Sequence, residues 1–346
     1  MKKTGIAALA LVLLLSACGG GDADKGRTAV VQGGGNAAPE GTAAEAGPDS
    51  ASEDFGITMR EILDANRTEV LTASRGSFLM ETAYEPEIDT TGQLSVIYAD
   101  GATVYLETDS SHELYTDQGS YLYMDGYFGA VLSAEPVTPD DFSSIMLDED
   151  TTILEEITGV DDNGDTLTVH TILSPEAIEN YFGEDMESTA YLKGDSTESA
   201  YTLDAEDLAV LSCATFLYHA DGTVQNVGTM SVTYGAELPE NGVILREHQN
   251  AEELRTVTIV LEPDTEEETV LSATAQRGDT VFPFLPEGYY ILYKDPACTE
   301  EYDENVDFDG NADLILYSRA MDLGEMLENA AIDQEEAEEA SVEEAP

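Results

Sequence analysis

The 346-residue chain contains no tryptophan, three cysteines, four histidines, and only 13 lysines and arginines against 72 acidic residues. Its formal charge of −59 argues against nucleic-acid binding, because such a surface repels the phosphate backbone. The same charge argues against attachment to anionic lipid headgroups through basic side chains. Sugar-binding platforms built on tryptophan are also excluded.

Catalytic motifs are missing as well. The four histidines, at positions 112, 170, 219 and 248, have no metal-ligand spacing, and there is no His-Glu-x-x-His pair. The chain has no Gly-x-Ser-x-Gly or Ser-x-x-Lys nucleophile motif and no glycine-rich phosphate loop. We therefore predict no enzymatic activity, no cofactor and no metal site, although a zinc site built from residues distant in sequence stays open.

Two acidic segments, Asp161–Asp165 and Asp307–Asp313, superficially resemble calcium loops. An EF-hand needs a 12-residue loop that is closed by a glutamate and flanked by helices, and neither segment has that context. Both are interpreted as polar turns, with calcium binding left as an open alternative.

The first residues have the pattern of an export signal. Two lysines, Lys2 and Lys3, precede an apolar run from Ile6 to Leu15, which is too short to span a bilayer as a mature helix. The following sequence, Leu-Ser-Ala-Cys18, resembles the bacterial lipobox. That resemblance implies cleavage of residues 1–17 and a diacylglyceryl thioether on Cys18, whereas an ordinary secretory signal is the alternative.

Residues 18–54 contain almost no large apolar side chain, so we expect a lipidated cysteine followed by a flexible tether. A random coil of this length has a mean reach of roughly 30–35 Å. Beyond it, Cys213 and Cys298 fall in what we predict to be separate domains. Export would permit a disulfide, but we expect two unpaired, at least partly buried thiols.

Residues 55–252 have the pattern of an α+β domain made mainly of strands. An amphipathic segment predicts a helix from about Thr58 to Ala73, and Ser174-Pro175 begins a second, short helix that ends at Gly183. Four Asx-Gly pairs lie between β-prone runs and predict antiparallel hairpins whose two central residues have positive φ. These pairs are Asp100-Gly101, Asp125-Gly126, Asn163-Gly164 and Asp221-Gly222.

This element order resembles the LolA/LolB-like fold of lipoprotein carriers. The resemblance implies a curved antiparallel half-barrel sheet with packed helices, which can hold acyl chains. No binding residue is carried over from it. The helices alone could equally fill the concave face.

Residues 255–320 contain an alternating strand, then Gly278-Asp-Thr-Val281, Glu287-Gly-Tyr289, Tyr293, Asp295 and Leu316-Tyr317. This order resembles the Listeria–Bacteroides repeat, also called the internalin B-repeat. The resemblance implies a small β-grasp-like module that binds a protein or cell-wall partner. Leu292 and Ala320 stand where the family has tryptophan, so a lighter core is expected. Residues 321–346 are acidic and are predicted to be a disordered tail.

Tyrosines crowd the predicted strands of the first domain. Alternation places Tyr121 and Tyr123 on one face, and together with Tyr127 they could line a ligand-binding groove. The alternative, which we favour, is that they form cross-strand packing pairs.

The sequence thus predicts a lipoprotein anchored to the extracytoplasmic face of the cell membrane. Its predicted role is non-catalytic binding at the cell surface. The alternative is a carrier or sensor of a lipid or another apolar ligand.

Overall fold

The computed structural model describes residues 55–85, 93–124, 126–182, 194–286, 289, 291–303 and 309–320. The predicted signal peptide, Cys18, the tether and the acidic tail lie outside these residues. The chain divides into two compact units. Unit 1 contains the described residues up to Ser111 together with Pro139–Pro239, and unit 2 contains His112–Thr138 and the described residues from Glu240 onward.

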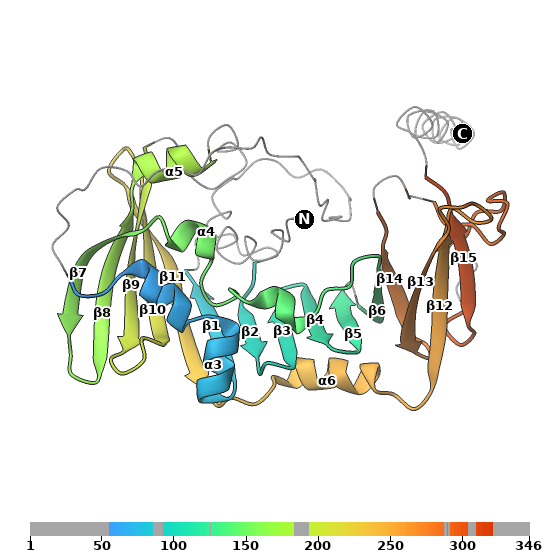
Figure 1. Cartoon of the computed structure of the whole chain (residues 1–346), viewed down its shortest axis with the longest axis horizontal. Coiled ribbons are helices and arrows are strands. Elements are labelled where there is room, and N and C mark those ends of the chain that lie inside the picture. Colours follow the sequence, from blue (N-terminus) through green and yellow to red (C-terminus); the bar gives the residue numbers. More distant parts are fainter. Residues whose placement is uncertain are drawn as a thin grey trace, which may run out of the picture. The chain divides into compact units, whose positions relative to one another are not determined.

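Unit 1 is built on a large antiparallel sheet, which is curved and open (Figure 1). Its strands follow the spatial order β3-β2-β1-β11-β10-β9-β8-β7. The predicted mainly β fold with a curved, open antiparallel sheet is therefore confirmed. The strands are β1 (Phe78–Tyr84), β2 (Val96–Ala99), β3 (Thr103–Glu107), β7 (Glu156–Asp162), β8 (Thr166–Leu173), β9 (Ser196–Asp204), β10 (Val210–Tyr218) and β11 (Val224–Tyr234).

The predicted hairpins form, but three of their turns differ from the predicted type; Asp125 of the fourth turn lies outside the described residues. Gly101, Gly164 and Gly222 have φ values of 85°, 90° and 86°, whereas the preceding Asx residues do not have positive φ. In the first hairpin, Asp100 itself closes the turn through its backbone N–H to Thr103 O, at 3.1 Å. Its carboxylate accepts the N–H of Thr103 at 2.8 Å, so the aspartate holds the turn and only the glycine needs the left-handed conformation.

The predicted helix over 58–73 is two helices, α2 (Met59–Ala65) and α3 (Thr68–Arg75). The break lies at Asn66, whose side chain is buried. Its amide nitrogen donates to the carbonyl oxygens of Ile62 and Leu208, at 2.8 and 2.9 Å, and its amide oxygen accepts the N–H of Val210 at 2.8 Å. These long-range hydrogen bonds compete with continuation of the helix.

The described part of unit 1 has three further short helices. They are η2 (Pro139–Phe142), α4 (Glu149–Thr152) and α5 (Pro175–Phe182). The predicted N-cap of α5 is confirmed, since the Ser174 hydroxyl accepts the N–H of Ala177 at 3.2 Å. Ile178 of α5 packs into a cluster with Leu173, Leu217 and Val227, so this helix covers the sheet over β8, β10 and β11.

The described residues of unit 2 form two groups of hydrogen-bonded strands and one helix, α6 (Glu240–Gln249). One group follows the order β14-β6-β5-β4 and the other the order β13-β12-β15. Leu132 of β6 packs with Ile259 and Leu316 in the core between the two groups. The strands are β4 (Ser111–Thr116), β5 (Gly119–Met124), β6 (Tyr127–Ser133), β12 (Leu254–Leu261), β13 (Thr269–Gln276), β14 (Thr280–Phe284) and β15 (Leu314–Ser318).

The pairing of β14 with β6 is parallel and was not predicted. It brings Thr280 opposite Gly129, where an added Cβ would lie 2.7 Å from the side chains of Phe282 and Thr280. Pro283 is accommodated because β14 is an edge strand. Among the helices that the structure describes, none has both the length and the apolar composition needed to cross a bilayer.

Candidate functional site

The three tyrosines predicted to line a groove all lie on β5 and β6, in unit 2. Tyr121 and Tyr123 share one face of β5, as alternation predicts. Register pairs Tyr123 with Phe128 and Met124 with Tyr127, so Tyr127 lies on the opposite face of the sheet. Tyr121 is 1% exposed, whereas Tyr127 is 65% exposed. The structure therefore brings together two of the three residues.

Tyr121 belongs to a hydrogen-bonded network that joins three elements of unit 2. Its hydroxyl donates to Asp279 Oδ2 at 2.6 Å and accepts the N–H of Gln276 at 3.1 Å. The same carboxylate oxygen lies 2.6 Å from Nδ1 of His248, at the end of α6. Burial, together with the hydrogen bond to Asp279, raises the pKa of Tyr121. The carboxylate thus holds the tyrosine and the histidine in fixed orientations.

Aromatic rings extend this network along the sheet. The rings of Phe128 and His248 are stacked, with centroids 4.1 Å apart, and Tyr123 lies 4.8 Å from Phe128. His112 stacks on Tyr123 at 5.6 Å. Tyr123 and Phe128 are direct cross-strand neighbours. This is the kind of packing that we favoured over a ligand-binding groove for these tyrosines.

An Asp–His pair can orient an imidazole for proton transfer when a nucleophile lies beside it. In the described part of the chain, the ring of His248 contacts Asp279, Phe128 and Tyr121, and no serine, threonine or cysteine is hydrogen-bonded to it. The arrangement can fix α6 against the sheet. It does not assemble a catalytic triad.

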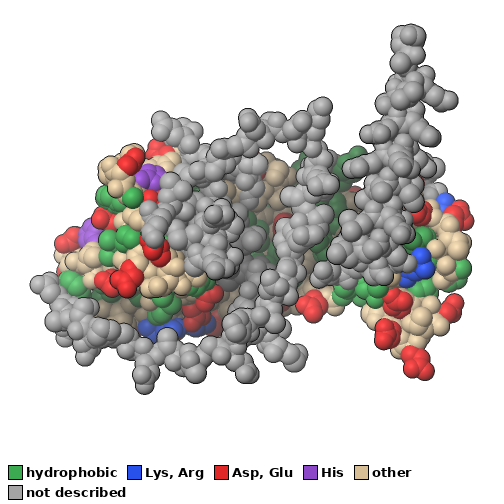
Figure 2. Space-filling model, turned by 90° about the horizontal axis from the view of Figure 1, so that it is seen from above, with side chains coloured by type: hydrophobic (Ala, Val, Ile, Leu, Met, Phe, Trp, Pro, Cys, Tyr) green, Lys and Arg blue, Asp and Glu red, His purple; other side chains and the backbone are tan. Residues whose placement is uncertain are grey.

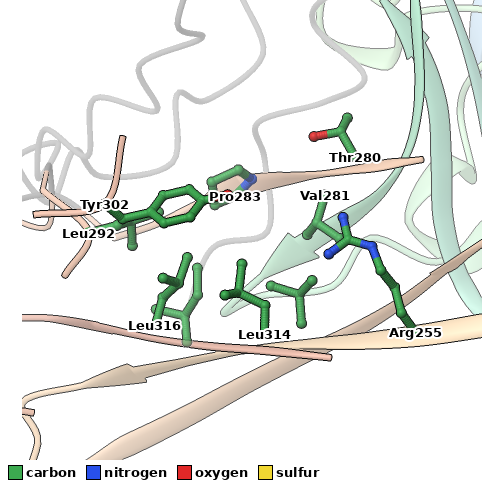
Figure 3. Close-up of a pocket in the computed structure, with 10 residues that line it drawn as sticks. Arg255, Thr280, Val281, Pro283, Leu292, Tyr302, Leu314 and Leu316 are labelled. Atoms are coloured by element: carbon green, nitrogen blue, oxygen red, sulfur yellow. The ribbon is translucent and has the colours of Figure 1, made fainter. Parts of the chain in front are cut away.

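A small cavity of about 60 Å³ lies beside this network in unit 2 (Figure 3). Leu314 and Leu316 face Pro283 across it, with the guanidinium of Arg255 at one end and Tyr302 at the other. Arg255 donates from Nη2 to the carbonyl oxygen of Asp279 at 2.7 Å, which connects the cavity to the network. The remaining lining residues are Val257, Ile259, Thr280, Val281 and Leu292.

The composition of the cavity limits what it can bind. A water molecule needs about 10–15 Å³ of cavity volume. The cavity therefore has room for a few waters or a few carbon atoms and is too small for an acyl chain. Leu292, which stands where the resembled repeat has tryptophan, forms part of the wall. Burial lowers the pKa of Arg255, but an arginine remains charged at physiological pH.

A second polar group of residues lies on the sheet of unit 1 and was not predicted. Glu155 accepts a hydrogen bond from the Tyr201 hydroxyl at 2.8 Å and another from the Thr171 hydroxyl. Register places Thr171 beside Ser199, which lies beside Thr215. We call this group the Glu155 cluster: Glu155, Thr171, Ser199, Tyr201, Cys213 and Thr215.

Burial dominates the electrostatics of the Glu155 cluster. It raises the pKa of Glu155 to about 7, although the two hydroxyl donors favour the carboxylate. It also raises the pKa of the Cys213 thiol to about 12, so this cysteine is a protonated, inert side chain at neutral pH. Cys213 and Cys298 are both free thiols.

The other predicted polar sites have structural partners. His219 Nδ1 lies 3.1 Å from Asp195 Oδ2, and His170 Nε2 lies 3.2 Å from Asp161 Oδ2 at a hairpin tip. Asp313 accepts the N–H of Thr256 at 2.8 Å, whereas residues 307 and 308 of the second acidic segment lie outside the described residues. Within the described ranges, no three His, Cys, Asp or Glu side chains gather to hold a metal ion.

No protein-family model matches the chain, and no curated protein matches its sequence. Among solved structures, a LolA superfamily protein of Nitrosomonas europaea is 11% identical, with a TM-score of 0.20, over 54% of this chain and 96% of that one. The Pseudomonas aeruginosa MucA/MucB complex is 12% identical, with a TM-score of 0.23, over 70% of this chain and 73% of that one.

A putative outer membrane lipoprotein-sorting protein domain from Vibrio parahaemolyticus is 11% identical, with a TM-score of 0.14, over 53% of this chain and 96% of that one. At these TM-scores the similarities do not place the chain in a family.

Proposed function

We propose that the protein is an extracytoplasmic, lipid-anchored binding protein without catalytic activity. The observation that favours this role over a lipid carrier is that the helices of unit 1 are themselves built into its core. Ile62 of α2 is fully buried, and Leu71 of α3 and Ile178 of α5 are each 1% exposed. An acyl chain bound on the covered face of the sheet would have to displace such side chains, at about 1.5–3 kcal/mol for each one exposed to water.

The hydrogen bonds of two acidic side chains support a role without catalysis. Asp279 and Glu155 are the acidic groups at the centre of the two polar networks, and both accept hydrogen bonds from tyrosine hydroxyls. These hydrogen bonds satisfy buried carboxyl oxygens within the fold. In the described part of the Asp279 network, no serine, threonine or cysteine is hydrogen-bonded to His248.

The anchor is supported by the sequence alone. Leu15-Ser-Ala-Cys18 has the lipobox pattern, and the polar stretch that follows is long enough to separate the folded units from a bilayer. Two acyl chains give stable membrane attachment, whereas one chain alone is marginal. No basic attraction is needed, which suits a chain of net charge −59.

The competing role, a lipid carrier, is tested by extraction. The full-length Cys18→Ser variant, which cannot carry the thioether, is purified from bacteria in a mild detergent-free buffer. Its organic extract is then analysed by mass spectrometry. A binding protein with a filled core is expected to yield less than about 0.1 lipid molecule per chain. Recovery of about one lipid per chain would favour the carrier instead. The lipid should then be lost in Ile178→Asp and retained in Val224→Asp, the same change at an exposed valine.

A further inference from the structure

The three-stranded sheet of unit 2 buries one face and exposes the other. Its inner face contributes Val257, Ile259 and Leu316 to the core of the unit. Register and alternation assign the intervening residues to the other side, which we call the outer face. It is formed by Thr256, Thr258 and Val260 of β12, Val270, Ser272 and Thr274 of β13, and Ile315 and Tyr317 of β15.

Apolar side chains are exposed on the outer face. Val270 is 57% exposed and Ile315 is 56% exposed, on the two strands that flank β12. Val260 lies between Val270 and Tyr317 in one cross-strand row, and Thr258 lies between Ser272 and Ile315 in the next. Single exposed apolar residues need no explanation, but a row of β-branched and aromatic side chains on adjacent strands is typical of an interaction surface.

Acidic side chains border this apolar row. The loop between β12 and β13 carries Asp264, Glu266, Glu267 and Glu268, all exposed. Arg319, also exposed, is the cation next to the end of β15. In Figure 2, hydrophobic, acidic and basic side chains are all visible over the part of the chain that holds β12, β13 and β15. The field at the outer face is therefore negative.

We propose that the outer face binds a basic segment of a partner protein, with apolar side chains at its centre and lysine or arginine at its rim. This rests on the proposed binding function and names the surface that performs it. A complementary charge steers association and sets specificity, while the apolar row supplies the buried contact.

Charge also argues against the other occupants of this face. Residues 321–346 contain ten acidic residues and no lysine or arginine, and residues 19–54 contain seven acidic residues and two basic ones. Either segment would be repelled by the acidic loop. A second copy of the chain would bring an identical acidic rim to the contact, and like charges across an interface are unfavourable.

The size of the face sets the expected affinity. A stable interface buries about 800 Å² on each partner, and an apolar row on three short strands supplies only part of this area. We therefore expect a dissociation constant on the order of 1–100 μM at low salt, weakening as salt screens the rim.

The test uses the full chain and a fluorescently labelled peptide of four Lys-Val repeats, with a peptide of four Glu-Val repeats as the control probe. Anisotropy is expected to show saturable binding of the basic peptide alone. Hydrogen exchange is expected to show protection in β12, β13 and β15. Val270→Lys should weaken binding at least tenfold, whereas Val224→Lys, the same change at a 50% exposed valine of β11 in unit 1, should leave it within twofold. Unchanged urea unfolding of both variants shows that the fold is intact.

Four results would overturn the proposal: no binding of the basic peptide, equal binding of the acidic one, equal loss in both variants, or protection outside unit 2. Sedimentation showing a wild-type dimer that Val270→Lys dissociates would assign the face to a second copy instead. Fatty-acid labelling of Cys18 is measured in parallel. If Cys18 is not labelled but the peptide binds, the proposed lipid anchor is wrong and the proposed role of the outer face stands. If Cys18 is labelled but the peptide does not bind, only the proposed role of the outer face is wrong.

Discussion

At the scale of single residues, Glu155 couples the stability of unit 1 to pH. Burial raises its pKa from 4.5 to about 7, so the folded chain retains a proton that the unfolded chain has already released. The contribution of Glu155 to the free energy of unfolding is therefore fully present below pH 4.5 and is lost as the pH rises through 7. The total fall is roughly 2–3 kcal/mol, from 1.4 kcal/mol per pKa unit with an allowance for partial solvent screening.

We predict that Glu155→Gln removes this fall, because the amide has no proton to release. Urea unfolding of the full chain between about pH 5 and pH 8 measures the difference from the wild type. Glu156→Gln is the matched control, since Glu156 is exposed and should retain the wild-type slope. Parallel pH profiles for the wild type and Glu155→Gln would show that the buried carboxyl is not protonated as described.

Asn66 is a second residue whose substitution is expected to lower the free energy of unfolding. Asn66→Ala removes three hydrogen bonds and leaves the Leu208 carbonyl and the Val210 N–H buried without this partner. We expect a loss of about 2–4 kcal/mol in the free energy of unfolding, because buried polar groups lose their compensation. Asn163→Ala, at an exposed hairpin tip, should change it by less than about 0.5 kcal/mol. Similar small effects for both variants would show that Asn66 does not tie the helices to the sheet.

At the scale of elements, the parallel pairing of β14 with β6 depends on the absence of a side chain at position 129. Gly129→Ala would place a Cβ 2.7 Å from Phe282 and Thr280 and 2.8 Å from the Thr280 carbonyl oxygen. We expect it to destabilise unit 2 by about 1–3 kcal/mol, as overpacking does elsewhere. Hydrogen exchange in β14 should quicken.

The control for this prediction is Gly159→Ala in β7, where the nearest atom lies 3.8 Å from an added Cβ. That variant should be close to neutral. Wild-type exchange rates in β14 of the Gly129→Ala chain would contradict the pairing.

Sequence patterns predicted the elements that are determined by neighbouring residues in the chain. Asx-Gly pairs located the hairpins, and Ser174-Pro175 located the start of α5. The same patterns did not predict the break at Asn66, which depends on groups about 140 positions away in the chain. They also did not predict β14, because Pro283 weakens its strand signal and its partner β6 lies far earlier in sequence.

In the candidate site too, the sequence did not predict contacts between residues that are distant in the chain. Alternation predicted that Tyr121 and Tyr123 share a face, and this is confirmed. It could not identify Asp279 as the partner of Tyr121, because 158 positions separate them. His248 lies on α6, a helix that was not predicted, and Glu155 gave no signal in a chain with 72 acidic residues. Domains drawn as continuous stretches of sequence also cannot show that His112–Thr138 lies in one unit with residues beyond 240.

At the scale of the whole molecule, the proposed function combines three parts. In this proposal a lipid at Cys18 supplies attachment, the polar stretch after it supplies distance from the bilayer, and the folded units supply binding. Attachment by lipid is the part on which the others depend, because a secreted chain of this charge would not remain at an anionic membrane.

Metabolic labelling with an alkyne fatty acid, followed by membrane fractionation, tests this directly. The full chain and its Cys18→Ser variant are compared in the same bacterial host. The account predicts that the wild type is labelled and sediments with membranes, and that Cys18→Ser is unlabelled and released from them. An unlabelled wild type, or a Cys18→Ser chain that stays in the membrane fraction, would contradict it.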